Sequence, residues 1–97
     1  TGHFMAATTA ATNDLIMESD GTLTWWQRTP TVRYGFCSAC GSSLFWEAHD
    51  KPDITAIAAG SLDGPTGLST TLTIFGNDAS DYYELDPEIK TKPHDWP

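Results

Sequence analysis

The sequence has few basic residues, and this shortage excludes several classes of protein. Five lysines and arginines stand against thirteen aspartates and glutamates, which gives a formal charge of −8. The basic residues are scattered and form no stripe, so a polyanion would be repelled and no nucleic-acid partner is expected. No apolar run approaches the roughly 20 residues of a membrane-spanning helix, and no leader-like segment is seen, so no membrane partner is expected either.

The sequence also lacks any helical pattern of useful length. Short segments rich in β-branched and aromatic residues recur instead, with turn-forming residues between them. The expected strands cover residues 3–8, 23–27, 31–36, 42–47, 54–60 and 72–75. We therefore predict an all-β, mainly antiparallel fold with a modest core. Residues 1–86 are expected to form a single domain, followed by a polar C-terminal tail over residues 87–97.

Cysteine is also scarce, and the two cysteines form one C-x-x-C pair, Cys37 and Cys40, followed by Gly41. Strands are expected on both sides, so the pair should lie in the turn of a hairpin. A redox pair of the thioredoxin type needs a helix that starts at the first cysteine, and Gly41 disfavours one. A strand–C-x-x-C-G–strand unit is instead typical of a zinc knuckle, in which backbone N–H groups point at a sulfur. We predict that Cys37 and Cys40 bind zinc, with a redox pair and inert thiols as alternatives.

Two thiolates make only half of a structural zinc site, which takes four ligands. His49 and His94 lack the paired spacing of a Cys2His2 site, and we do not expect them to complete it. The monomer by itself is therefore not expected to bind zinc tightly, and a homodimer that shares ligands is one solution. Cysteines at metal spacing, with no N-x-S/T glycosylation motif, favour a reducing compartment such as the cytoplasm.

Several segments, taken in order, are similar to one known family. Arg33–Glu47 resembles the second cysteine block of that family. The similarity continues through Ile57–Leu68 and then through residues 74–75 and 81–83. Thr1–Phe4 resembles the residues directly after the first cysteine block of the family. This order resembles the glutathione-dependent formaldehyde-activating enzymes, a family that includes centromere protein V.

The resemblance implies a small zinc-containing β-tent fold with a C-x-x-C-G knuckle hairpin. In that family the pair matching Cys37 and Cys40 binds a structural zinc together with an N-terminal C-x-C pair. A second, catalytic zinc is held by a C-x-C-x-x-C block that precedes the segment matching Thr1–Phe4. Neither block is present in the sequence, so we expect an N-terminally incomplete domain with catalytic cysteines upstream of residue 1. His3 and Phe4 would then lie near the catalytic zinc and contact the substrate or the zinc ligands, although a histidine at a strand edge is an equal alternative.

The resemblance also implies a carbon–sulfur lyase, in which a thiol such as glutathione adds to a small aldehyde to form S-hydroxymethylglutathione or a related adduct. Zinc suits this reaction because it favours the thiolate and polarises a carbonyl oxygen. The alternative hypothesis is a non-catalytic, zinc-stabilised β module that serves in binding or interaction. A third hypothesis, a protein similar to methionine sulfoxide reductases, needs a reactive cysteine in addition to the zinc ligands, and the sequence has none to spare.

Overall fold

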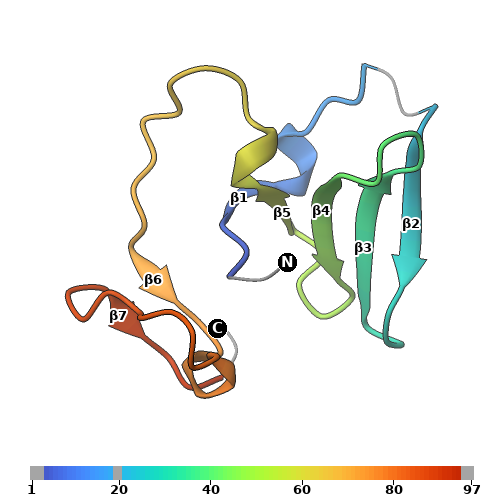
Figure 1. Cartoon of the computed structure of the whole chain (residues 1–97). Helices are drawn as coiled ribbons and strands as arrows, with labels where there is room; N and C mark the ends of the chain where they lie inside the picture. Colours follow the sequence, from blue (N-terminus) through green and yellow to red (C-terminus); the bar gives the residue numbers. More distant parts are fainter. Residues whose placement is uncertain (1–3, 19–20, 95–97) are drawn as a thin grey trace. The chain divides into compact units, whose positions relative to one another are not determined.

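The computed structural model describes residues 4–18 and 21–94 (Figure 1). Two compact units are present: one spans Ala6–Asp63, and the other comprises the chain from Gly64 onward together with the N-terminal residues up to Met5. The fold is all-β and mainly antiparallel, as predicted, and the described residues contain three short 3-10 turns but no α-helix. Accordingly, none of these residues belongs to a helix long and apolar enough to cross a membrane.

The first unit is a five-stranded antiparallel sheet. Its strands are β1 (Ala7–Ala11), β2 (Leu23–Gln27), β3 (Val32–Cys37), β4 (Ser43–Ala48) and β5 (Ile54–Ala58). The spatial order is β1-β5-β4-β3-β2. The chain therefore passes from one edge at β1 to the other edge at β2, and then returns strand by strand until β5 pairs with β1.

The first strand begins later than the sequence pattern indicates. A strand was expected over residues 3–8, but β1 starts at Ala7, whose partner in the register is Ala58 at the end of β5. A 3-10 turn, η2 (Ala59–Ser61), follows β5 at once and takes the chain out of the sheet. Among the described residues before Ala7, Ala6 is tied to this end of the sheet by one bond, which the Ala59 N–H donates to its carbonyl oxygen.

The cross-strand register separates the aromatic side chains onto the two faces of the sheet. Trp25 of β2, Gly35 of β3 and Phe45 of β4 are direct partners, and the two rings stack with centroids 6.1 Å apart. Trp26 and Tyr34 also pair across β2 and β3 and stack at 6.0 Å. Because successive side chains of a strand point to opposite faces, the second pair lies on the face opposite the first.

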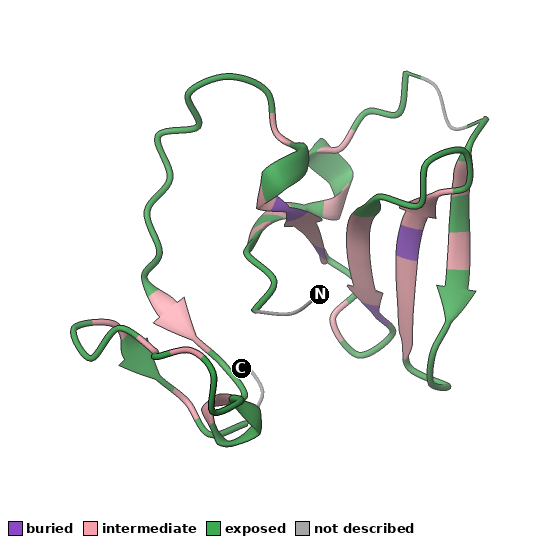
Figure 2. Ribbon diagram, in the orientation of Figure 1, coloured by how far each residue is buried: buried purple, intermediate pink, exposed green. Residues whose placement is uncertain are grey.

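Few side chains in the sheet are fully buried (Figure 2). Apart from glycine, the buried residues are Ala48, Ala58 and Thr55, with exposed fractions of 5%, 9% and 1%. The Thr55 hydroxyl lies 3.0 Å from Thr12 Oγ1 and 3.5 Å from Glu47 Oε1, so the most deeply buried polar side chain has partners. With so small a core, the sheet depends strongly on its backbone ladder and cross-strand side-chain pairs.

The second unit contains a short parallel pair of strands, β6 (Leu72–Thr73) and β7 (Lys90–Thr91). The strand expected over residues 72–75 ends at Thr73. Phe75 adopts a left-handed backbone with φ 53° and leads into the 3-10 turn η3 (Gly76–Asp78). β7 falls within residues 87–97, the expected tail, and both of its residues are exposed.

Candidate functional site

The turn between β3 and β4 carries both cysteines. Cys37 is the last residue of β3, and its N–H donates to the Ser42 carbonyl oxygen at 2.9 Å. The N–H of Gly41 donates to the Cys37 carbonyl oxygen at 2.7 Å. Gly41 has φ 80°, a left-handed conformation that glycine adopts without steric cost. We call Cys37–Ser42 the cysteine turn.

Hydrogen-bond donors surround the sulfur of Cys37 and favour its thiolate. The Thr22 hydroxyl, 3.6 Å from Sγ, has the largest effect, followed by the backbone N–H groups of Cys40 and Ala39. Together with the Cys40 side chain they lower the pKa of Cys37 from 9.0 to about 7, against a small opposing effect of burial. The N–H of Ser38 donates to the Thr22 carbonyl oxygen at 2.8 Å, and this bond ties the loop before β2 to the cysteine turn.

The donor set of the cysteine turn fits half of a zinc site. Zinc binds cysteine as the thiolate, and N–H groups directed at the sulfur are the usual outer support of such a ligand. Cys40 is exposed and directly follows the intervening Ser38–Ala39 pair, with its Sγ 3.2 Å from Ser42 Oγ. Across residues 4–18 and 21–94, no three His, Cys, Asp or Glu side chains are grouped so that they could hold a metal. Cys37 and Cys40 would therefore supply two of the four ligands of a structural zinc.

The described histidines do not join the cysteines. His49 follows β4 at the end opposite the cysteine turn, and its N–H donates to the Thr31 carbonyl oxygen. The six residues of β4 separate it from the turn by roughly 20 Å of extended chain. His94 belongs to the second unit, where its carbonyl oxygen accepts a bond from the Phe75 N–H.

The two residues expected near a catalytic zinc are only partly described. His3 lies outside the described residues. Phe4 is 61% exposed and makes an edge-to-face contact with Tyr83, with ring centroids 6.1 Å apart. A role for His3 and Phe4 in contacting the substrate stays a prediction.

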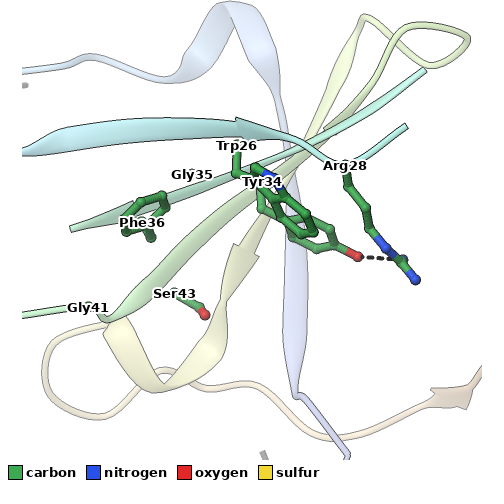
Figure 3. A pocket seen from close by; sticks show the side chains of 7 residues that line it. All are labelled: Trp26, Arg28, Tyr34, Gly35, Phe36, Gly41 and Ser43. Carbon is green, nitrogen blue, oxygen red and sulfur yellow. Dashed lines mark hydrogen bonds between the residues drawn. The ribbon is translucent and has the colours of Figure 1, made fainter. Parts of the chain in front are cut away.

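A shallow hollow of about 550 Å³ lies on β2 and β3 and reaches the cysteine turn (Figure 3). The residues that line it are Trp26, Arg28, Tyr34, Gly35, Phe36, Gly41 and Ser43. Nη1 of Arg28 donates to the Tyr34 hydroxyl at 3.1 Å, and the guanidinium carbon lies 5.9 Å from the centre of the Tyr34 ring. The hollow therefore combines one cation with an aromatic wall.

Sequence reasoning did not identify Arg28 and Tyr34 as candidate site residues. The sequence feature that could have identified them is the short connection around Thr29–Pro30, which joins two expected strands rich in aromatic residues. A tight hairpin there places Trp26 opposite Tyr34, and hence Arg28 near the same face.

The second arginine near the sheet is already paired. Nε and Nη2 of Arg33 donate to Glu47 Oε2 at 3.2 and 2.8 Å, and the guanidinium lies over the Trp25 ring, 3.8 Å from its centroid. Thr55 contributes a further, longer contact to the same carboxylate. This cluster stabilises the face of the sheet that carries Trp25.

Comparison with known proteins identifies one family. The model of the family described as glutathione-dependent formaldehyde-activating enzyme matches residues 1–78. Neither the curated proteins nor the solved structures gave a significant match.

Proposed function

Because the chain belongs to the glutathione-dependent formaldehyde-activating enzyme family, we propose that it acts in a zinc-dependent carbon–sulfur lyase. In the proposed reaction the sulfur of glutathione adds to the carbonyl carbon of a small aldehyde. A carbon–sulfur bond forms, the thiol proton passes to the carbonyl oxygen, and S-hydroxymethylglutathione or a related adduct results. The family match supports the glutathione and formaldehyde part of this proposal.

The observation that carries the zinc part is the environment of Cys37. A thiol whose pKa is about 7 is partly ionised at neutral pH and is therefore ready to bind a metal. Cys37 and Cys40 would hold a structural zinc, which would brace β3 against β4 in a sheet with few buried side chains. The two remaining ligands, and those of a catalytic zinc, would come from outside the described residues. A catalytic zinc would favour the glutathione thiolate and polarise the aldehyde oxygen.

The direct test is formaldehyde exchange, that is, the rate at which glutathione and S-hydroxymethylglutathione interconvert in the presence of formaldehyde. In the full-length protein, native mass spectrometry should find zinc, and two-dimensional exchange NMR should show faster interconversion of glutathione and S-hydroxymethylglutathione than in buffer alone. Cys37→Ser and Cys40→Ser should each lower the zinc content by one ion per chain. A folded, zinc-loaded protein that leaves the exchange at the buffer rate would exclude the lyase.

A non-catalytic, zinc-stabilised β interaction module is the second candidate. It is supported by the described residues, which offer the cysteine pair but no group of three metal-binding side chains. It predicts at most one zinc per chain, or one zinc shared by two chains in a homodimer, and no exchange activity. Either function requires reduced cysteines, so we propose a cytoplasmic location.

A further inference from the structure

Arg28 is the cation of the hollow, and one side-chain hydrogen bond connects it to the aromatic wall. Its Nη1 bonds to the Tyr34 hydroxyl, and its backbone N–H donates to the Val32 carbonyl oxygen at 3.0 Å. In the adjoining turn, Nε2 of Gln27 donates to the carbonyl oxygens of Thr29 and Val32 at 2.7 and 3.2 Å. The bonds in the turn fix the backbone from which Arg28 extends, and the single bond to Tyr34 holds its exposed guanidinium beside the hollow.

The charge of Arg28 is also available. Within the described residues no carboxylate forms an ion pair with it, whereas Arg33 is paired with Glu47. The chain carries a formal charge of −8, so small anions are repelled from most of its surface. The Arg28 guanidinium, which has no ion-pair partner among the described residues, is a local positive site on this negatively charged surface. Its parallel N–H donors match the two oxygens of a carboxylate.

The hollow also offers a surface for the body of a ligand. Trp26 is 57% exposed although it stacks on Tyr34 with only 20° between the ring planes. Flat aromatic surface of this kind packs well against planar groups such as peptide units. Figure 3 shows Arg28 at one end of the hollow and, at the other end, Gly41 of the cysteine turn and Ser43 at the start of β4.

We propose that this hollow binds the carboxylate end of a small peptide-like thiol of the glutathione class. Arg28 pairs with the carboxylate, and the peptide units lie along Trp26 toward Ser43. The choice of glutathione rests on the proposed function, whereas the assignment of Arg28 and Trp26 rests on the hollow itself. Arg28 is then the residue that selects for an anionic thiol.

Glutathione binding by the full chain tests the assignment. By isothermal titration calorimetry, Arg28→Gln should raise the dissociation constant for glutathione roughly five- to tenfold, since it removes a charge-assisted contact at an exposed site. Arg28→Lys should restore part of the loss. Lys90→Gln makes the same change of charge outside the hollow and should leave binding unchanged.

A matched ligand tests the carboxylate itself. The dimethyl ester of glutathione lacks both carboxylates, so it should bind the wild-type chain weakly and be indifferent to Arg28→Gln. Raising the salt concentration should weaken the binding of glutathione to the wild type more than to Arg28→Gln, because salt screens the exposed pair.

The outcomes separate this inference from the proposed function. Unchanged glutathione binding in a folded Arg28→Gln variant, or no glutathione binding by the wild type, overturns the subsite. If glutathione binding depends on Arg28 but formaldehyde exchange is not catalysed, the subsite is supported and the lyase function is excluded. If exchange is catalysed, Arg28→Gln should raise the KM for glutathione with little effect on kcat. An unchanged KM would overturn the subsite but leave the lyase function supported.

Discussion

The indole ring of Trp25 lies directly against Gly35, its partner across β2 and β3. A Cβ atom on Gly35 would stand 3.1 Å from Cζ3 and 3.2 Å from Cη2 of Trp25, which is tighter than most packed contacts. The ring can therefore lie close to the sheet, stacked with Phe45 and beneath the Arg33 guanidinium. This layer of aromatic and cationic groups covers a sheet that buries few other side chains.

Gly35→Ala should destabilise the first unit by about 1–3 kcal/mol, because the added methyl group overpacks the contact with Trp25. Urea denaturation, followed by tryptophan fluorescence, measures the change. Gly60→Ala is the matched control, since a Cβ there meets nothing within 4 Å. Equal stability of the two variants would contradict the close packing of Trp25 on Gly35.

Thr55→Val should cost about 1–2 kcal/mol of unfolding free energy. The change keeps the shape of a side chain that is 1% exposed but removes the hydroxyl between Thr12 and Glu47. Thr9→Val, at an exposed position of β1, makes the same substitution without breaking a described bond and should be close to neutral. Chemical denaturation compares the two, and a neutral Thr55→Val would show that the polar contact stabilises nothing.

In the zinc-free protein, alkylation of Cys37 by iodoacetamide should reach half its maximal rate near pH 7, because its pKa is about 7. Thr22→Val removes the largest cause of the lowered pKa and should move this midpoint toward 9.0. Mass spectrometry of peptides separates Cys37 from Cys40. A midpoint that does not move in Thr22→Val would contradict the role of the hydroxyl.

The same pKa sets the direction of a pH effect on stability. The pKa of Cys37 is lower in the folded chain than its ordinary value of 9.0, so the folded state binds fewer protons between the two values. Its contribution to stability is complete above about pH 9 and is lost as the pH falls through about 7. The effect should disappear in Cys37→Ser, which a pH series of thermal melts would show.

Gly41→Ala should loosen the cysteine turn, because φ 80° costs a residue with a Cβ atom about 1–2 kcal/mol. If Cys37 and Cys40 bind zinc as proposed, Gly41→Ala should lose it faster to a chelator, followed with a zinc-sensitive dye, while Gly60→Ala should behave as the wild type. Equal rates of zinc loss would mean that the conformation of Gly41 does not support the metal.

Short-range patterns predicted much of the first unit. The strands expected at residues 23–27, 31–36, 42–47 and 54–60 correspond to β2–β5 within about two residues, because alternation and turn chemistry are local properties of the chain. The strand expected at residues 3–8 shifted to Ala7–Ala11, since its position depends on where β5 ends.

The sequence by itself determined the all-β character, the family and the presence of a cysteine pair, because these depend on short segments and on their order along the chain. Only the tertiary structure decided what surrounds those residues. Thr22 reaches Cys37 across 15 positions, and Arg28 meets Tyr34 through the pairing of two strands. A strand register is chosen by the combined fit of many distant side chains, and a shift of one residue would move Trp26 to the other face and remove the wall of the hollow.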